Sequence, residues 1–197
     1  MKIFKDRKAA GSLLAKKLRR TKADLILGIP RGGVVVAAEI AKALKLPLDI
    51  VVVRKIGHPN QPELALGAVD SDGEAVLDES LISQFEIKKA WKEVKRREDE
   101  YRQGKEPIDV EGKTVILVDD GIATGLTTLS AINYLKRHQA SKIILAVPVA
   151  STEAVDKLSK EVWEMVVLHT PEYFQAVGQF YHDFEEVTDE EVVQLLS

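Results

Sequence analysis

The sequence predicts an α/β protein with an open, mostly parallel, twisted sheet flanked by helices on both faces. Short continuous apolar runs, such as 25–29 and 114–118, alternate with segments of about a dozen residues whose apolar side chains recur at helical spacing. Strands that are apolar throughout are typical of a parallel sheet, because helices bury both of its faces. Ligands of such sheets bind at the carboxyl ends of the strands, so we expect a site in the turns there.

Each element follows from its own pattern of apolar residues. A helix is expected over 6–20, where apolar residues recur at helical spacing and Asp6 occupies the N-cap position. The remaining elements are expected, in order, as a strand at 25–29, a helix at 34–45, a strand at 48–53, a helix at 85–102, a strand at 114–118, a helix at 126–137, a strand at 142–147, a helix at 152–160 and a strand at 162–168.

Two segments interrupt this alternation. Segment 55–66 (KIGHPNQPELAL) holds two prolines, a glycine and an asparagine, which predicts a long exposed loop. The helix over 85–102 is amphipathic, so we expect it to pack by one face. We interpret the whole chain, 1–197, as a single domain with a core over about 20–168 and a small hood from its two ends, about 1–19 and 169–197.

The composition excludes several classes of site. The chain has 197 residues with a net charge of −3 and no cysteine, so disulfides, zinc–thiolate sites, iron–sulfur clusters and cysteine nucleophiles are ruled out. A near-neutral charge argues against a dedicated nucleic-acid-binding protein, and no apolar run is long enough to span a membrane. The sequence starts without a charged-then-apolar signal segment, so we expect a cytoplasmic location.

The most informative stretch is 115–128 (VILVDDGIATGLTT). Its apolar strand delivers two adjacent carboxylates, Asp119 and Asp120, to a turn that opens a helix. Carboxylates accept hydrogen bonds from a vicinal diol, whereas the backbone amides of 123–127 and the nearby threonine hydroxyls suit a phosphate dianion. The turn therefore predicts a ribose 5-phosphate site.

Other interpretations of this turn explain fewer of its residues. It lacks the Gly-Lys-Ser/Thr ending of a P-loop and the glycine spacing of a dinucleotide site. A plain strand-to-helix connection, with Asp120 as N-cap, needs only one carboxylate and one glycine. The turn at 30–33 (PRGG), taken alone, is also compatible with an ordinary connection.

Residues 115–128 resemble the phosphoribosyl-pyrophosphate (PRPP) motif of the type I phosphoribosyltransferases, with four apolar residues, two acids and a glycine/threonine turn. Residues 28–33 (GIPRGG) stand where that family carries its pyrophosphate loop. The resemblance extends over about 6–187, to a group of predicted phosphoribosyltransferases whose acceptors are unassigned. It implies the family fold, transfer of phosphoribosyl from PRPP to a nitrogenous acceptor such as a nucleobase, and release of pyrophosphate.

The resemblance also implies roles for individual residues. Asp119 and Asp120 would contact the 2′ and 3′ hydroxyls of the ribose, and the turn after them its 5′-phosphate. Lys55 and Asp120 would be catalytic, and 55–66 would form a mobile lid in which His58 and Glu63 are further candidates. The implied substrate-binding residues are Arg31, Gly32, Gly33, Asp119, Asp120, Ala123, Thr124, Gly125, Leu126, Thr127 and Thr128.

The implied cofactor is Mg²⁺, carried by PRPP rather than held in a fixed protein site, because Mg²⁺ keeps waters and takes few carboxylates. The implied partners are PRPP, pyrophosphate and a small nitrogenous acceptor. We expect a homodimer, with neither a membrane nor a nucleic acid as a partner.

Two departures from the family pattern concern the acceptor. Ala123 stands where enzymes acting on 6-oxopurines have a third aspartate, and 146–150 (AVPVA) offers no lysine, which argues against hypoxanthine and guanine. The tail over 170–184 is rich in aromatic residues and forms either a packing cover or a ring-stacking platform. The candidate base-binding residues in it are Phe174, Phe180, Tyr181 and Asp183.

A basic run lies on the helix over 85–102. Six lysines and arginines fall within 88–97, followed by three acids. A solvated helix face with i,i+4 pairs Glu93–Arg97 and Glu98–Arg102 accounts for this run. The alternative function is a non-catalytic, PRPP-binding regulator that contacts nucleic acid, and a third is a homologue acting on another phosphorylated ribose.

Overall fold

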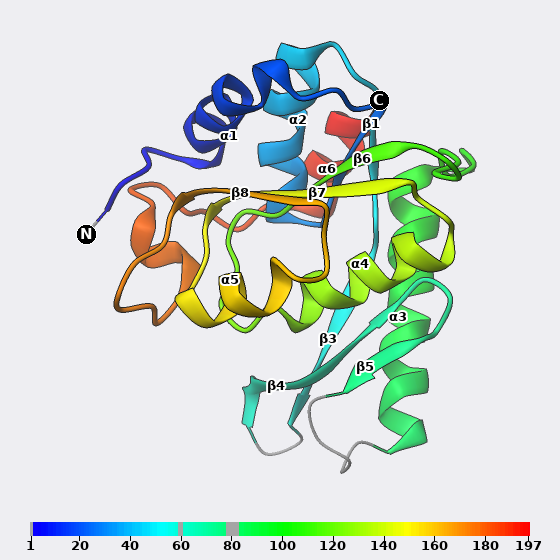
Figure 1. Ribbon diagram of the computed structural model, residues 1–197. Coiled ribbons are helices and arrows are strands. Elements are labelled where there is room, and N and C mark those ends of the chain that lie inside the picture. Colours follow the sequence, from blue (N-terminus) through cyan, green and yellow to red (C-terminus); the bar gives the residue numbers. More distant parts are fainter. Residues whose placement is uncertain (1, 59–60, 78–82) are drawn as a thin grey trace.

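The computed structural model describes residues 2–58, 61–77 and 83–197, with the backbone alone at 58 and 61–65. At its centre lies a parallel sheet with strand order β2-β1-β6-β7-β8 (Figure 1). The predicted parallel α/β sheet is therefore confirmed. The strands are β1 (Leu25–Gly28), β2 (Leu48–Ile50), β6 (Thr114–Val118), β7 (Lys142–Val149) and β8 (Glu164–His169).

Helices cover both faces of this sheet (Figure 1). On one face, Ile26, Ile116 and Ile144 pack against α1 (Arg7–Lys17) and α2 (Gly32–Leu44). On the other, leucines at neighbouring strand positions pack against α4 (Leu126–Arg137) and α5 (Thr152–Leu158). Each buried leucine or isoleucine contributes about 1.5–3 kcal/mol, so the two apolar layers are a large part of what holds the sheet in place.

The predicted helices of the core are confirmed with small changes at their ends. The α4 bounds agree with the prediction, whereas α2 begins two residues earlier, at Gly32. Asp6 caps α1 as expected, because its carboxylate accepts a hydrogen bond from the Ala9 amide at 2.7 Å. A single 3₁₀ turn, Leu18–Arg20, continues α1 toward β1.

The prediction of a long loop over 55–66 is wrong. This segment forms a β-hairpin from β3 (Val53–His58) and β4 (Gln61–Asp70), with β5 (Ala75–Leu77) paired to the far side of β4. Pro62 lies where the register slips, between the pairs Gly57↔Ala65 and His58↔Gln61. A proline lacks the amide hydrogen that a regular ladder uses, so an irregular register tolerates it.

The same hairpin divides the strand predicted at 48–53. Only Leu48–Ile50 joins the parallel sheet as β2, and the chain then turns into β3 from Val53. The apolar run is continuous across both strands because Val51 and Val52 are also buried. Apolar patterning therefore predicted burial correctly but did not mark the change of sheet.

A long helix, α3 (Gln84–Arg102), packs along the hairpin, as Figure 1 shows. Ala90 and Val94 are buried against Ile56 and Val69, which confirms that the helix packs by one face. Trp91 adds a hydrogen bond from its indole N–H to the Ser71 carbonyl, at 3.1 Å. The helix and the hairpin thus form one unit beside the main sheet.

Two segments from near the opposite ends of the chain, around Phe4 and Tyr181, pair beside the carboxyl ends of the strands. Phe4 and Tyr181 form a parallel bridge, and the Phe4 amide donates to the Phe180 carbonyl at 2.9 Å. A 3₁₀ turn (Val177–Phe180) and a helix not predicted from the sequence, α6 (Asp189–Leu196), complete this end. Among the described residues, no helix has the length and apolar character to cross a bilayer.

Gly33, at the start of α2, sits against the end of β6. A β-carbon added at Gly33 would lie 2.8 Å from the Val118 carbonyl oxygen and 2.9 Å from the Asp119 α-carbon. Both are backbone atoms, so neither can move aside without shifting the strand. Gly33 therefore allows the helix and the strand end to meet.

Gly33→Ala is expected to destabilise the protein by about 1–3 kcal/mol, because the added methyl group overpacks a backbone contact. Thermal denaturation should show a lowered Tm. Gly104→Ala measures backbone strain alone, since a β-carbon there meets nothing within 4 Å but alanine is strained at a φ of 84°. An unchanged Tm for Gly33→Ala would contradict the close contact.

Candidate active site

The turn after β6 lies at the carboxyl end of the sheet and is tied to the end of β7. The Ile122 amide donates to the Val149 carbonyl at 2.9 Å, and the Ser151 amide donates to the Ile122 carbonyl at 3.0 Å. The Ser151 hydroxyl donates to the Ala123 carbonyl at 2.6 Å. These bonds hold the turn in place while leaving the Ala123 side chain exposed.

Helix α4 begins at this turn without a side-chain cap. Its N-cap is Gly125, with a φ of 78°, and within the described ranges no side chain caps the first amides of the helix, at 126–128. Amides in a first turn have no partner within the helix, which makes them donors for an anion. Thr124 is exposed and Thr127 half-buried, but Thr128 is only 1% exposed, so its hydroxyl is not presented with the others.

Asp119 and Asp120 are held at the start of the turn by contacts from three directions. The Asp119 carboxylate accepts the backbone N–H of Asp120 at 2.8 Å. The Asp120 carboxylate accepts a charged hydrogen bond from Arg7 Nε at 2.7 Å, and the Asp120 carbonyl accepts the hydroxyl of Tyr181 at 2.6 Å. Arg7 and Tyr181 come from opposite ends of the chain, so both ends position this acid pair.

Burial makes the negative charge of this pair costly. Burial raises the pKa of Asp119 well above its usual range, and the neighbouring Asp120 charge raises it further. Burial also raises the pKa of Asp120, although the Arg7 guanidinium opposes this by favouring the ionised form. One cation thus serves two carboxylates, and hydroxyl donors of a ligand would stabilise the remaining charge.

The turn after β1 contacts the acid pair directly. A β-carbon at Gly32 would lie 1.9 Å from the Asp120 carboxylate oxygen Oδ2 and 2.8 Å from Arg7 Nε. The structure therefore brings Gly32 and Gly33 together with Asp119 and Asp120, as the resemblance implied. The peptide bond between Pro30 and Arg31, just before these glycines, is cis.

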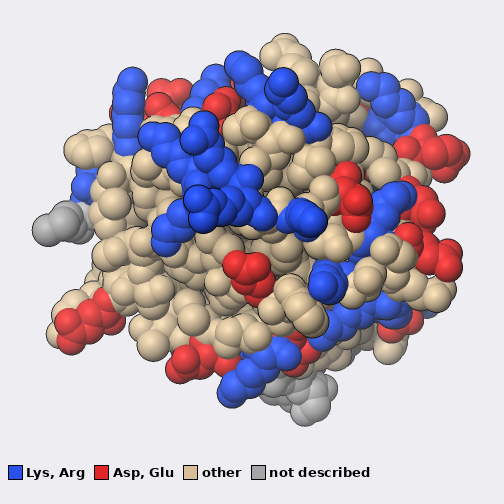
Figure 2. All heavy atoms as spheres, turned by 45° about the horizontal axis from the view of Figure 1, so that its top comes forward, with Lys and Arg blue, Asp and Glu red and all other residues tan. Residues whose placement is uncertain are grey.

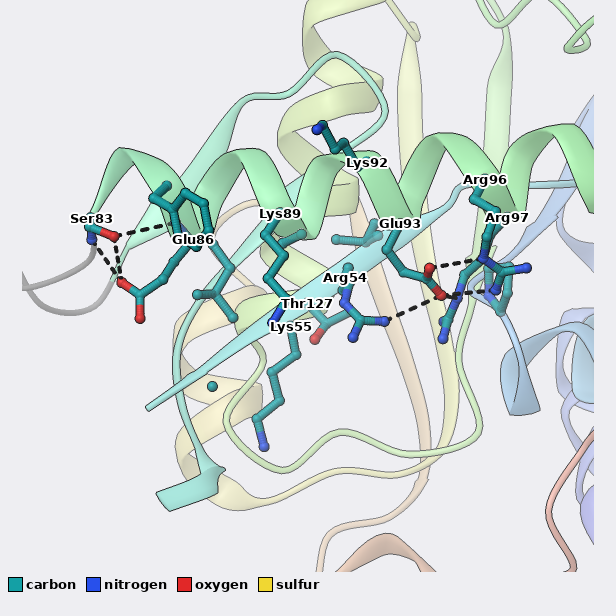
Figure 3. A pocket seen from close by; sticks show the side chains of 16 residues that line it. Arg54, Lys55, Ser83, Glu86, Lys89, Lys92, Glu93, Arg96, Arg97 and Thr127 are labelled. Atoms are coloured by element: carbon teal, nitrogen blue, oxygen red, sulfur yellow. Dashed lines mark hydrogen bonds and ion pairs between the residues drawn. The ribbon is translucent and has the colours of Figure 1, made fainter. Parts of the chain in front are cut away.

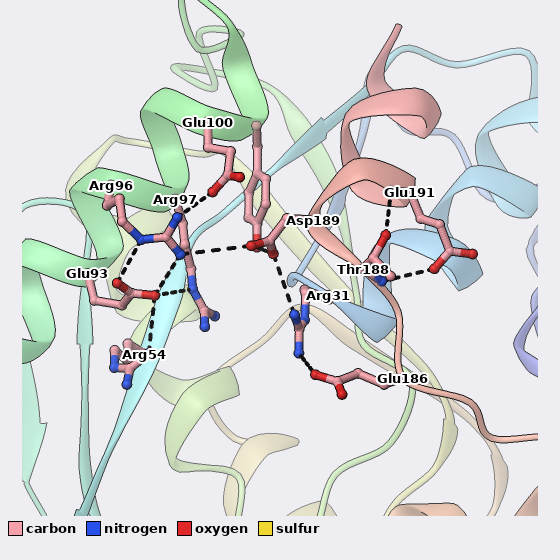
Figure 4. Close-up of polar contacts among 11 residues, drawn as sticks. Arg31, Arg54, Glu93, Arg96, Arg97, Glu100, Glu186, Thr188, Asp189 and Glu191 are labelled. Atoms are coloured by element: carbon pink, nitrogen blue, oxygen red, sulfur yellow. Dashed lines mark hydrogen bonds and ion pairs between the residues drawn. The ribbon is translucent and has the colours of Figure 1, made fainter.

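Arg31 is paired with the C-terminal segment rather than pointing freely into the turn (Figure 4). Its guanidinium forms an ion pair with Glu186 and lies 3.6 Å from the Asp189 carboxylate. Asp189 in turn lies 3.8 Å from Arg96 on α3. Carboxylates of the chain itself thus contact the guanidinium that was expected to bind pyrophosphate.

A large cavity of about 1,260 Å³ lies between β3 and α3 (Figure 3). Lys55 lines it from β3, and Pro30 and Thr127 bring the two predicted substrate turns to its wall. Lys55 therefore lies near these turns, as expected if segment 55–66 covers the site. The side chains of His58 and Glu63, the other candidates on this segment, lie outside the described residues.

The candidate base-binding aromatics differ in their exposure. Phe180 and Tyr181 are 2% and 1% exposed, so they offer no free face for a ring and form the packing cover. Phe174 is half-buried, with its ring centroid 5.1 Å from that of Phe180. Asp183 is exposed, and its backbone amide donates to the Lys5 carbonyl at 2.8 Å.

Arg7 is the site residue that the sequence did not reveal. Besides its bond to Asp120, it donates to the Glu185 carbonyl at 2.8 Å, and its guanidinium lies 3.7 Å from the centroid of the Phe184 ring. Arg7 and Asp120 are 113 positions apart. In the sequence Arg7 is one cation among several at the start of a helix, with no local signal that distinguishes it.

Three cations of the basic run on α3, Lys95, Arg96 and Arg97, pair with acids on the same helix. Glu93 and Arg97 form the predicted i,i+4 pair at 3.0 Å. The predicted Glu98–Arg102 pair is wrong, because Glu98 pairs with Lys95 and Arg102 turns to the buried Asp49 at 2.7 Å. Asp49 attracts Arg102 more strongly than a solvated glutamate does, since screening by water is weaker there.

A second basic surface lies at the opposite, amino ends of the strands. Figure 2 shows lysine and arginine side chains gathered on the face that forms the top of Figure 1. A cavity of about 530 Å³ at the starts of β6 and β7 is lined by residues that include Lys17, Arg20, Lys22 and Lys142. This surface is separate from the acid pair at the carboxyl ends.

A comparison with protein families shows which family the chain belongs to. Residues 3–185 match the family model described as the phosphoribosyl transferase domain. The chain belongs to this family. Its acid pair, the turn at 123–128 and the glycines at 32 and 33 therefore lie within the matched domain of a phosphoribosyl transferase.

Relatives of similar sequence support this membership. A Mycobacterium tuberculosis H37Rv protein, provisionally named a phosphoribosyl transferase, is 42% identical over 207 aligned positions, which cover 100% of this chain and 47% of the relative. The chain thus spans about half the length of that relative. The crystal structure of TT1426 from Thermus thermophilus is 42% identical with a TM-score of 0.84, and covers 98% of this chain and 97% of that chain.

A more distant structure shares the fold. The purine phosphoribosyltransferase from Pyrococcus horikoshii is 19% identical with a TM-score of 0.53, over 92% of each chain. The type I phosphoribosyltransferase fold expected from the sequence is therefore confirmed. At this level of identity, the similarity concerns the fold alone.

Asp119→Asn is expected to stabilise the protein at neutral and higher pH. A carboxyl whose pKa is raised on folding binds a proton more tightly in the native state, so it lowers stability as the pH rises above about 4, its unfolded pKa. Urea denaturation at pH 8 should show a gain of about 1 kcal/mol or more.

The gain should shrink at pH 4, where aspartate in the unfolded chain is partly protonated. Asp156→Asn, at an exposed position on α5, serves as the control and should change stability little at either pH. A loss of stability for Asp119→Asn at pH 8 would contradict a raised pKa at Asp119.

Proposed function

We propose that this protein transfers a phosphoribosyl group from PRPP, bound as its Mg²⁺ complex, to a small nitrogenous acceptor and releases pyrophosphate. One observation carries the proposal: a half-buried pair of carboxylates, Asp119 and Asp120, contacts Gly32 on one side and leads on the other into a helix start that no described side chain caps. These parts match the sugar hydroxyls, the pyrophosphate and the 5′-phosphate of one ligand.

The proposed binding mode uses each part for one group of PRPP. The 2′ and 3′ hydroxyls donate to Asp119 and Asp120, which need donors because Arg7 compensates only part of their charge. The 5′-phosphate accepts from the amides at 123–128 and from the hydroxyls of Thr124 and Thr127. The pyrophosphate lies against the amides at 32 and 33, where the absence of side chains permits close approach.

In this binding mode, Arg31 releases Glu186 and binds the pyrophosphate instead. Its ion pair with Glu186 is solvent-exposed on the glutamate side, where the side chain is 79% exposed. An exposed ion pair contributes about 0–1 kcal/mol, so a pyrophosphate oxygen can replace Glu186 at low cost. A planar guanidinium can then bind two oxygens of the leaving group.

The reaction is a displacement at C1 of the ribose. The bond between C1 and the pyrophosphate oxygen breaks with its electron pair going to pyrophosphate, and the lone pair of the acceptor nitrogen forms the new bond to C1. The acceptor nitrogen then gives up its proton. Asp119 and Asp120 orient the sugar, while Lys55 and the amides of the glycine turn stabilise the charge on the leaving group.

The carboxylates of the proposed site suit a metal ion that binds together with PRPP. Among the described residues, no group of three or more histidines, aspartates and glutamates is arranged to hold an ion. Asp119 and Asp120 are the carboxylates beside the proposed ligand, and Mg²⁺ is commonly held by one or two carboxylates together with phosphate oxygens and waters. When bound, Mg²⁺ would neutralise charge on the pyrophosphate and make it a better leaving group.

In this proposal, the acceptor is not a 6-oxopurine. Ala123 is exposed in the turn and carries no group that could accept a ring proton, and Ala146 and Val147 are buried apolar residues at the end of β7. Phe180 and Tyr181 are buried as well, so a ring would have to use Phe174 or residues on the cavity side. A panel of acceptors is therefore the direct test.

Pyrophosphate release from Mg²⁺–PRPP should be measured with adenine, hypoxanthine, guanine, uracil, orotate and nicotinate. The wild-type protein is expected to release pyrophosphate with at least one acceptor other than hypoxanthine and guanine. The double variant Asp119→Asn/Asp120→Asn should lose at least 99% of this activity, because amides are weaker acceptors for the diol.

Asp99→Asn/Asp156→Asn is the matched control, since it removes the same two charges from exposed positions on α3 and α5. It should retain full activity. PRPP binding without turnover of any acceptor would favour a non-catalytic PRPP-binding protein, and equal activity in both double variants would contradict the proposed site.

A further inference from the structure

The cavity between β3 and α3 carries more positive charge than transfer from PRPP requires. The charged residues that line it are Arg54, Lys55, Lys89, Lys92, Arg96, Arg97, Glu86 and Glu93. Among the described residues that line the cavity, six are thus cations and two are acids. Since α3 packs along the hairpin beside the main sheet, this excess lies next to the proposed site without belonging to either of its two turns.

The two acids of the cavity are already engaged. Glu86 accepts hydrogen bonds from the amide and the hydroxyl of Ser83, both at 2.9 Å, and so caps the start of α3. Glu93 is shared by three guanidinium groups, which belong to Arg54, Arg96 and Arg97 (Figures 3 and 4). A single carboxylate compensates only part of that charge.

The distances around Glu93 show how tightly this charge is gathered. Arg96 and Arg97 donate to it at 2.9 and 3.0 Å, and Arg54 lies 3.6 Å away on the facing strand. Hydrogen bonds from Arg96 outweigh the effect of burial and lower the pKa of Glu93 to about 2. Two structural elements thus direct guanidinium groups at one point in the cavity, as a bound phosphate would require.

Lys89 adds a cation with no ion pair among the described residues of the cavity wall. Figure 3 shows its side chain pointing from α3 in the same direction as Lys55 on β3. Arg96, by contrast, is also paired with Glu100 and Asp189 outside the cavity. Lys89 on α3 and Arg54 on β3 thus line the cavity from its two sides.

An exposed aromatic ring lies beside these cations. Phe85, in the first turn of α3, is 75% exposed and lines the same cavity, together with the apolar side chains of Ile56 and Ala90. Its neighbour Glu86 caps the start of α3 by accepting a hydrogen bond from the Ser83 amide. Such a surface suits a planar ring.

We propose that this cavity, which we call the α3 cleft, binds a nucleotide, with its phosphates on Arg54 and Lys89 and its ring against Phe85. The volume of about 1,260 Å³ exceeds the roughly 300–1,000 Å³ of usual small-molecule pockets, so a nucleotide fits with water around it. Pro30 and Thr127 form a wall shared with the phosphoribosyl site. The nucleotide would therefore bind next to PRPP, on its pyrophosphate side.

A nucleotide matches the α3 cleft better than a nucleic acid strand. Lys95, which does not line the cavity, pairs with Glu98, and Arg96 at the cavity wall also pairs with Glu100. These acids would repel a phosphate backbone. Lys89, which lines the cavity, has no ion pair among the described residues. A short ligand that enters the cavity meets the cations that line it, whereas a strand lying across the helix also meets the acids.

Isothermal titration calorimetry at about 0.15 M salt tests the proposal, with ATP, GTP and inorganic tripolyphosphate as probes. The wild-type protein should bind ATP or GTP. Arg54→Gln/Lys89→Gln should weaken binding of every probe at least tenfold, because both changes remove a cation from the cleft. Phe85→Ala should weaken ATP or GTP at least threefold and leave tripolyphosphate unchanged.

Arg19→Gln/Lys88→Gln is the matched control, since it removes one exposed arginine and one exposed lysine that do not line the cleft. Its affinities should equal those of the wild type, and circular dichroism should show all variants folded. No binding of ATP or GTP at millimolar concentration would overturn the proposal. So would an equal loss in the control, or tighter binding of a 15-mer oligothymidylate than of either nucleotide.

This experiment tests the α3 cleft independently of the proposed phosphoribosyl transfer, because the calorimetry contains no PRPP and does not depend on turnover. Nucleotide affinity that falls in Asp119→Asn/Asp120→Asn but not in Arg54→Gln/Lys89→Gln would place the nucleotide in the phosphoribosyl site and overturn the α3 cleft. Affinity that falls only in the cleft variant would support it.

Discussion

Two half-buried carboxylates at the end of a central strand are the constraint on which this structure depends. Asp119 and Asp120 cannot both stay charged there without donors, because burial disfavours ionisation and their charges repel. Arg7 from α1 supplies one donor, and the hydroxyl of Tyr181 donates to the Asp120 carbonyl, just after the pair. Gly32 leaves the space in which this cluster fits. The charge that remains is what a sugar diol would satisfy.

The ends of the chain complete the site by folding over the carboxyl side of the sheet. The N-terminal helix contributes Arg7, while Glu186 and Asp189 of the C-terminal segment hold Arg31. Asp120 and Arg31 thus each have a charged partner within the chain. A ligand exchanges these partners rather than entering an uncompensated cavity, which lowers the cost of keeping the site folded.

Local patterns predicted the parallel sheet and the two turns that the structure brings together at 32–33 and 119–128. Strands buried on two faces and the D-D-G-x-x-T-G turn can be recognised within a few residues. They did not predict the hairpin, since Pro62 falls at an irregular register that proline tolerates. They missed the partners of Asp120 and Arg31, which lie more than 100 positions away in the chain. Such contacts depend on how the ends fold back, and no local pattern encodes that.

The central claim is that the acid pair binds the sugar of PRPP. Calorimetric titration with Mg²⁺–PRPP, ribose 5-phosphate and Mg²⁺–pyrophosphate tests it most directly, on the wild type and on Asp119→Asn/Asp120→Asn. The account predicts that the variant loses at least 100-fold in affinity for PRPP and ribose 5-phosphate, and keeps its affinity for pyrophosphate. Unchanged PRPP affinity in the variant, or no PRPP binding to the wild type, would contradict it.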